Sequence, residues 1–115
     1  MDGDRLRTWE DILHLPEQEQ PEIVNGKPYY RAGQRNHHGR TLARLTAQLV
    51  AADGPNLRDG WWICAEATVR LAPHQIVCPD LVGWRRARLP DLPNDWPCDI
   101  RPDWGCEVLS LSNAW

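Results

Sequence analysis

The run Ile76-Val77-Cys78-Pro79-Asp80-Leu81-Val82 decides the fold of this 115-residue chain, because its apolar side chains fall on both faces of an extended segment. A strand that is apolar on both faces typically lies in the middle of a sheet, between two covering layers. A second run of this kind, Trp104-Gly105-Cys106-Glu107-Val108-Leu109, follows later in the chain. Both runs are therefore expected as central strands.

Two shorter patterns precede these runs. Thr8 is a suitable helix cap, and the acidic residues in the following Trp9-Glu10-Asp11-Ile12-Leu13 favour a first helical turn, so a short helix is expected before Pro16. Farther along, Asn25-Gly26 stands between two strand-like runs. This dipeptide is the strongest short-range signal for a β-hairpin, and a hairpin is expected there.

The middle of the chain predicts a longer helix and one more strand. Leu42, Leu45 and Leu49 recur at helical spacing and form one apolar stripe that should pack on a sheet. The segment 61–71 alternates between apolar and polar residues, as a half-buried strand does. Together these elements predict one α/β domain over residues 1–115, with a mixed β-sheet flanked by helices.

The composition is that of a globular protein, with 42% hydrophobic and 25% charged residues. A net charge of -3 argues against attraction of the whole molecule to nucleic acid, so DNA contact requires a local basic patch. No apolar run approaches the roughly 20 residues of a membrane span, and the first seven residues are too polar for a secretory signal. No membrane association and a cytoplasmic location are therefore expected.

Each of the two apolar runs contains one carboxylate, Asp80 in the first and Glu107 in the second. Two carboxylates on adjacent buried strands repel each other, and a divalent cation between them removes this repulsion. Oxygen ligands favour Mg²⁺ or Mn²⁺. From the residues alone a second interpretation is equally open, in which each carboxylate lies at a strand end, solvated or paired with Arg70 or with one of Arg85 and Arg86.

Four short motifs occur in a fixed order: Thr-Trp-Glu-Asp at 8–11, Pro-Glu-Ile-Val-Asn-Gly-Lys-Pro-Tyr at 21–29, Val-Cys-Pro-Asp-Leu-Val at 77–82 and Cys-Glu-Val-Leu-Ser at 106–110. In this order they resemble the Uma-type family of putative restriction endonucleases, bacterial members of the PD-(D/E)XK nuclease superfamily. The resemblance covers about residues 8 to 114. It implies a restriction-endonuclease-like fold and Mg²⁺-dependent hydrolysis of phosphodiester bonds in DNA.

The resemblance also implies an acidic catalytic cluster. The three acidic positions of the family fall on Glu22, Asp80 and Glu107, of which Asp80 and Glu107 would hold Mg²⁺ or Mn²⁺. Glu22 rests mainly on the resemblance. Its alternative is a solvated residue at the edge of the hairpin, because glutamate is mostly exposed in folded proteins.

The chain departs from the family pattern at a lysine. The superfamily commonly has a lysine two residues after the second acid, where this chain has Leu109, and Lys27 on the predicted hairpin is the only lysine in the sequence. The Uma-type family has its lysine on a later helix. We therefore expect a chain that lacks the C-terminal helix and strand of the fold, with impaired nuclease activity. The alternative is a non-catalytic remnant that binds DNA or a partner subunit, and a homodimer is one such assembly.

Basic and histidine side chains provide candidates for DNA contact, although each is also explained as a solvated residue on a helix or turn. A zinc site built on His74 and Cys78 is disfavoured, because the paired short spacings of structural zinc sites are absent. The four cysteines are instead expected as reduced thiols. The DNA-binding candidates are His38, Arg35, Arg40, Arg85 and Arg86.

Overall fold

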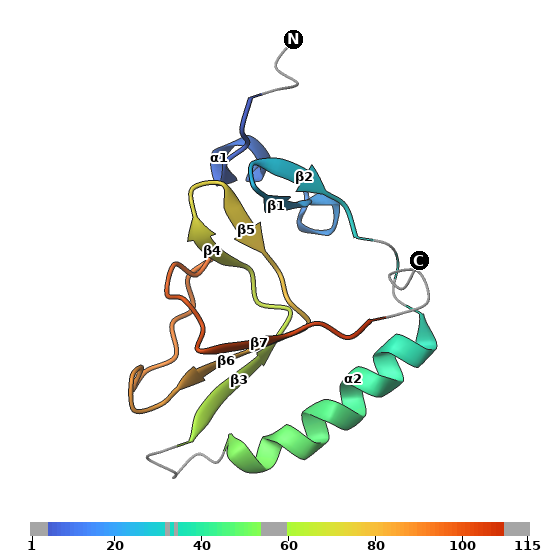
Figure 1. Cartoon of the computed structure of the whole chain (residues 1–115), viewed down its shortest axis with the longest axis vertical. Coiled ribbons are helices and arrows are strands. Elements are labelled where there is room, and N and C mark those ends of the chain that lie inside the picture. Colours follow the sequence, from blue (N-terminus) through green and yellow to red (C-terminus); the bar gives the residue numbers. More distant parts are fainter. Residues whose placement is uncertain (1–4, 32, 34, 54–59, 110–115) are drawn as a thin grey trace. The chain divides into compact units, whose positions relative to one another are not determined.

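The computed structural model describes residues 5–31, 33, 35–53 and 60–109. The chain divides into two compact units (Figure 1). The first unit consists of residues 1–31, 68–78 and 95–101, and the second unit of residues 32–67, 79–94 and 102–115. Each unit is therefore assembled from segments that are far apart in the sequence.

The first unit contains a four-stranded antiparallel sheet with the strand order β2-β1-β5-β4. Short helical turns precede it in the chain. Its elements are α1 (Trp9–Ile12), the 3-10 turn η1 (Glu17–Glu19), β1 (Glu22–Val24), β2 (Lys27–Tyr29), β4 (Val69–Ala72) and β5 (Gln75–Val77).

The β1–β2 hairpin confirms the expectation from Asn25-Gly26. Both residues have positive φ, 53° and 79°, and Val24 pairs with Lys27 across the two-residue loop. These angles suit a type I′ turn, whose twist matches that of the strands. Gly26 is required here for a second reason, because a Cβ at this position would lie 2.6 Å from the side chain of Leu6.

The core of the first unit is apolar. Ile23 of β1 and Ile76 of β5 pair with each other and are fully buried, and Trp9 and Ile12 of α1 pack in the same cluster. The Trp9 ring also meets Trp96 edge to face, with ring centroids 4.9 Å apart. Short elements are stable here because their buried faces converge on one cluster.

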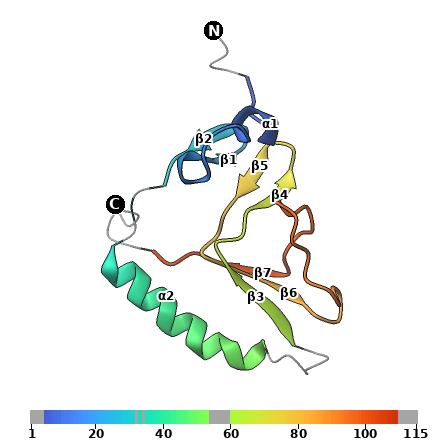
Figure 2. The ribbon, with the colours of Figure 1, turned by 180° about the vertical axis from the view of Figure 1, so that it is seen from behind.

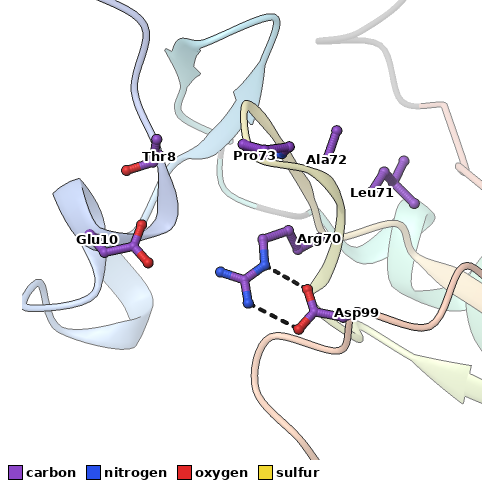
Figure 3. Close-up of a pocket in the computed structure, with 7 residues that line it drawn as sticks. All are labelled: Thr8, Glu10, Arg70, Leu71, Ala72, Pro73 and Asp99. Atoms are coloured by element: carbon purple, nitrogen blue, oxygen red, sulfur yellow. Dashed lines mark hydrogen bonds and ion pairs between the residues drawn. The ribbon is translucent and has the colours of Figure 1, made fainter.

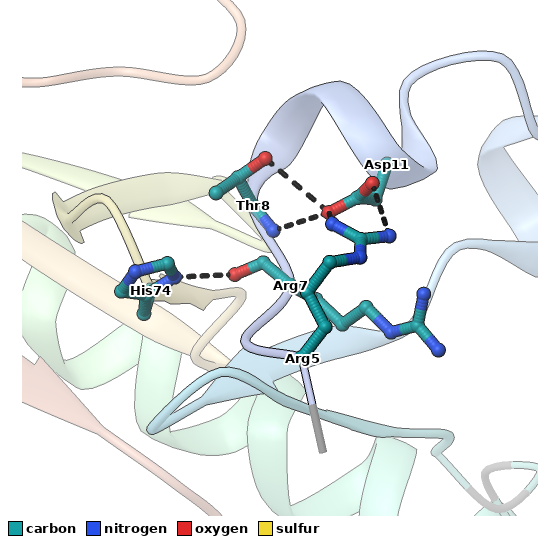
Figure 4. A network of polar contacts seen from close by, with 5 residues as sticks. All are labelled: Arg5, Arg7, Thr8, Asp11 and His74. Carbon is teal, nitrogen blue, oxygen red and sulfur yellow. Dashed lines mark hydrogen bonds and ion pairs between the residues drawn. The ribbon is translucent and has the colours of Figure 1, made fainter. Parts of the chain in front are cut away.

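A network of polar contacts fastens the N-terminal segment to this unit (Figure 4). Asp11 accepts hydrogen bonds from the Arg5 guanidinium at 2.9 and 3.1 Å and from the backbone N–H of Thr8 at 2.8 Å. The Arg5 guanidinium, followed by the Thr8 N–H, lowers the pKa of Asp11 to about 2. His74 Nδ1 lies 2.7 Å from the carbonyl oxygen of Arg7, which only accepts, so Nδ1 carries the proton.

The second unit contains a three-stranded antiparallel sheet with the order β3-β6-β7 and one long helix. Turning the molecule by 180° shows the same helix, α2, beside this sheet (Figure 2). The elements are α2 (Asn36–Leu49), the 3-10 turn η2 (Val50–Ala52), β3 (Trp61–Ala65), β6 (Leu81–Arg85) and β7 (Trp104–Cys106).

Strand β6 is the centre of the second unit, and its first four residues are buried. Close packing surrounds Gly83, because a Cβ there would lie 3.1 Å from the Trp61 ring and 3.2 Å from Ile63. Leu49 of α2 faces the sheet across a cavity of about 210 Å³ that Trp61, Ile63 and Trp104 also line. The leucine stripe of α2 is only half-buried.

The α/β fold class is confirmed, but the strands form two antiparallel sheets instead of the single mixed sheet that was expected. The run 76–82 is divided between β5 and β6, since Pro79 between them has no N–H to continue a ladder. The run 61–71 is divided in the same way, with Glu66 at a φ of 55° between β3 and β4. This combination of helices and two sheets is compatible with a restriction-endonuclease-like fold.

The position of the last strand differs from the expectation. Strand β7 lies at the edge of its sheet, and Trp104 and Gly105 are exposed, so the run 104–109 is not a central strand. As an edge strand, β7 pairs with one strand, β6. Among the residues that the structure describes, no helix is long and apolar enough to cross a membrane.

Candidate acidic site

Asp80 lies directly before the central strand β6 of the second unit. Its side chain is almost completely buried, with 2% of the residue exposed, and the next two residues, Leu81 and Val82, are fully buried. Among the described residues only His38 is another buried polar or charged residue, with 6% exposed. A charged group is rarely buried unless it is paired or binds a metal, so Asp80 marks a special position.

Three segments of the second unit hold Asp80. Its Oδ2 atom accepts the backbone N–H of Val108 at 2.7 Å and lies 3.2 Å from Nε2 of His38 on α2. Its carbonyl oxygen accepts the backbone N–H of Glu66 at 3.1 Å. An ionised carboxylate only accepts hydrogen bonds, so with Asp80 ionised the proton on Nε2 belongs to His38, which donates it.

Glu107 occupies the position opposite Asp80 in the continued β6–β7 register. Leu81 pairs with Cys106, so the next residues outward are Asp80 and Glu107. Both residues lie just beyond the last ladder pair, since β6 begins at Leu81 and β7 ends at Cys106. The structure therefore brings the two predicted metal ligands to one end of one ladder, where Asp80 is buried and Glu107 is exposed.

A third acidic residue lies near Asp80 in the chain that follows β3. Glu66 follows Ala65, the partner of Leu81, and donates its backbone N–H to the carbonyl oxygen of Asp80. This position of Glu66 depends on the register between β3 and β6, which no sequence motif predicts. In the described part of the chain, however, no three His, Cys, Asp or Glu side chains converge closely enough to hold a metal ion.

Two carboxylates would suffice only for a hard cation that keeps part of its water shell. Mg²⁺ is usually bound through one or two carboxylates, with water and substrate phosphate completing its octahedron. Asp80 and Glu107 supply two carboxylates without a sulfur or nitrogen ligand set. This chemistry suits Mg²⁺ or Mn²⁺ better than Zn²⁺, which takes four protein ligands in structural sites.

Glu22, the third acid of the predicted cluster, belongs to the first unit. Its Oε1 atom accepts the backbone N–H of Cys78 at 2.6 Å, where β5 ends. Glu22 is half-buried and bonded, so the interpretation as a solvated hairpin residue is wrong. In the chain Cys78 is followed by Pro79 and Asp80, and Glu22 thus fastens the segment that leads to Asp80. A catalytic role of Glu22 stays a prediction.

The two histidines at the start of α2 have different surroundings. His37 is exposed, as a solvated helix start predicts, whereas His38 is buried against Asp80. The solvated interpretation is therefore wrong for His38, and its burial also conflicts with the expected direct contact to DNA. The sequence contains a signal for this position: His38, Leu42, Leu45 and Leu49 follow one another at helical spacing on a single face.

The arginine candidates for DNA contact divide into two groups. Arg86 is held inside the second unit: Nη2 lies 2.6 Å from Asp53, Nε donates to the carbonyl of Trp61, and the guanidinium stacks 3.6 Å above the Trp62 ring. Only 13% of its side chain is exposed, which conflicts with the expected phosphate contact. The other three candidates, Arg35, Arg40 and Arg85, are exposed.

A pocket of about 480 Å³ in the first unit contains a second charged group (Figure 3). Arg70 and Asp99 form a bidentate pair there at 2.6 and 2.9 Å, and Thr8 and Glu10 also line the pocket. The hydrogen bond from Arg70 lowers the pKa of Asp99, and the same bond raises the pKa of Arg70. The expectation that Arg70 compensates Asp80 or Glu107 is therefore wrong, because Asp99 is its partner.

Comparison with known proteins shows the family of the chain. No curated protein matches the chain. The model of the Uma2 family, described as putative restriction endonuclease, matches residues 9–114, a span that contains Glu22, Asp80 and Glu107. Because this match covers nearly the whole chain, the protein belongs to the Uma2 family of putative restriction endonucleases.

Proposed function

We propose that this protein is a Mg²⁺-dependent endonuclease that hydrolyses phosphodiester bonds in DNA, with Asp80 and Glu107 as the residues that hold the metal. Membership of the Uma2 family supports nuclease chemistry. The observation that supports this location is the buried, doubly hydrogen-bonded carboxylate of Asp80, which precedes Leu81, whose ladder partner Cys106 precedes Glu107.

Each acidic residue has a separate role in the proposed mechanism. Bound Mg²⁺ supplies Lewis acidity and lowers the pKa of its water. Asp80 provides a fixed oxygen ligand, because His38 and Val108 hold its carboxylate from two elements. Glu107, which is exposed, would provide the second oxygen ligand. Glu22 is the third acid that the family resemblance assigns to catalysis.

Exposed arginines of the second unit are proposed to bind DNA phosphates. Helix α2 carries Arg40 and Arg44 and contains no aspartate or glutamate, so it is a local basic element in a chain of net charge -3. Arg35 before α2 and Arg85 at the end of β6 add to it. Arginine contacts with phosphate release counterions and give affinity that depends strongly on salt.

The leucine two positions after Glu107 favours an alternative function without catalysis. Leu109 stands where the superfamily commonly has a lysine, and it is 68% exposed. General acid-base groups contribute about 10²- to 10⁴-fold to a rate, so the proposed enzyme turns over slowly. The alternative is a DNA-binding protein of the same fold without catalysis, and the homodimer expected from the sequence is compatible with both.

Plasmid nicking with Mn²⁺ tests the proposal. We expect weak cleavage that Asp80→Asn and Glu107→Gln abolish and that Glu19→Gln, an exposed residue of η1, leaves unchanged. Leu109→Lys restores the cation and should increase cleavage about 10²-fold. The proposal fails if Asp80→Asn cuts as well as the wild type. DNA binding without cleavage, even in Leu109→Lys, would establish the non-catalytic alternative.

A further inference from the structure

We infer that His38 is a positioning residue of the metal site: it donates from Nε2 to Asp80 and fixes the direction in which this carboxylate meets a divalent cation. The inference rests on the proposed function and extends it to a residue that does not itself touch metal or DNA. The hydrogen bond of 3.2 Å between two buried side chains carries it.

The place of His38 in α2 is unusual for a structural residue. Leu42, Leu45 and Leu49 continue its face of the helix, so a leucine at position 38 would extend the apolar stripe. Burying an imidazole in this position costs free energy unless its polar atoms are paired. Of all side chains on α2, only that of His38 is fully buried, and its partner is the candidate metal ligand.

The geometry around Asp80 explains what the hydrogen bond does. Both His38 Nε2 and the backbone N–H of Val108 approach the same oxygen, Oδ2, from different elements of the second unit. Two donors on one oxygen restrict rotation of the carboxylate about its last bond. A ligand that is already oriented loses less conformational entropy when the metal binds.

The rival explanation is that the hydrogen bond between His38 and Asp80 serves only the stability of the fold. Measurements of stability and of metal affinity distinguish the two explanations. Removing the outer hydrogen-bond partner of a metal ligand typically lowers metal affinity about 10- to 100-fold. Removing only one partner of a buried pair usually destabilises the fold, so some loss of stability in His38→Leu is expected on either explanation. A positioning role predicts in addition that fully folded His38→Leu binds the metal more weakly, whereas a purely structural role predicts unchanged affinity of the folded variant.

The decisive experiment compares three variants by calorimetric titration with Mn²⁺ and by urea unfolding. We expect His38→Leu to weaken Mn²⁺ binding about 10- to 100-fold, and His38→Gln, whose amide N–H replaces Nε2–H, to stay within about threefold of the wild type. His37→Leu, the exposed neighbour, is the matched control and should bind like the wild type. Equal affinity in His38→Leu and wild type would overturn the inference.

A measurement on the unaltered protein covers the case in which His38→Leu does not fold. In protein with ¹⁵N-labelled histidine, Mg²⁺ should shift the Nε2 signal of His38 along the binding isotherm and leave that of His37 in place. A His38 signal unchanged at saturating Mg²⁺ would overturn the inference.

These experiments also separate the inference from the proposed function. Mn²⁺ binding that is lost in Asp80→Asn but kept in His38→Leu removes the role of His38 alone. Wild-type protein that binds neither Mn²⁺ nor Mg²⁺ removes the metal site itself and the role of His38 with it.

Discussion

The two units of the molecule differ in the kinds of side chains that they bury. Among the described residues, the first unit buries apolar side chains around Ile23 and Ile76, whereas the second buries the Asp80–His38 pair beside the equally buried Leu81. A buried ionisable pair contributes less stability than apolar packing of the same volume. Among the described residues, the second unit therefore combines an apolar core with a buried polar pair, whereas the first unit contains an apolar core alone.

Both units contain ion pairs. In the first unit Arg5 is paired with Asp11 and Arg70 with Asp99, and in the second Arg86 is paired with Asp53 and Arg88 with Asp103. Within the part of the chain that the structure describes, no acidic partner is found for Arg40 on α2 of the second unit. Paired charges contribute little to binding a polyanion, so this arginine supports the proposed DNA contact through α2 of the second unit.

The largest effect is expected from the core of the first unit. Ile23→Ala removes a fully buried side chain and should lower the free energy of unfolding by about 2 to 5 kcal/mol. Val24→Ala, at the neighbouring exposed position, should change it by less than about 1 kcal/mol. Urea unfolding measures both. If folded Ile23→Ala also loses Mn²⁺ affinity, the assignment of the metal site to the second unit alone is wrong.

A smaller effect distinguishes the two adjacent arginines of the second unit. Arg86→Ala breaks the contacts to Asp53, Trp61 and Trp62 and should cost about 1 to 3 kcal/mol of stability. Arg85→Ala removes only an exposed contact, 5.2 Å from the Trp61 ring centroid, and should cost at most about 1 kcal/mol, but it should reduce the salt dependence of DNA affinity by about one phosphate contact. DNA titrations at several salt concentrations measure the slope. A lower slope for Arg86→Ala together with an unchanged slope for Arg85→Ala would contradict this assignment and would give the phosphate contact to Arg86.

The smallest effect is expected in the acid stability that the Arg5–Asp11 ion pair gives the first unit. The folded pKa of Asp11 is about 2, below its ordinary value of 3.8. Its ionised form therefore stabilises the fold above about pH 4, and this contribution is lost as the pH falls through about 2. Thermal unfolding at several pH values should show a flatter acid limb for Asp11→Asn than for the wild type. Asp95→Asn, exposed in the same unit, serves as the control, and an equal flattening there would contradict the assignment.

Features that are encoded in neighbouring residues could be predicted from the sequence. The turn at Asn25-Gly26, the short helix after Thr8 and the long helix with its leucine stripe all occur where the pattern predicts them. Each depends on local backbone preferences or on helical spacing, which require no knowledge of distant contacts. The apolar run 76–82 and the family motif at 77–82 likewise single out Asp80 from local sequence.

The tertiary structure alone decided which strands are neighbours and which charges are paired. Position 80 follows a break at Pro79 between two sheets, and β7 lies at the edge of its sheet. Arg70 pairs with Asp99, 29 positions away, instead of with Asp80 or Glu107. The contact from His38 to Asp80 spans 42 positions. Register and side-chain pairing of this kind depend on contacts between distant segments, so an identical local sequence is compatible with several outcomes until the whole chain is packed.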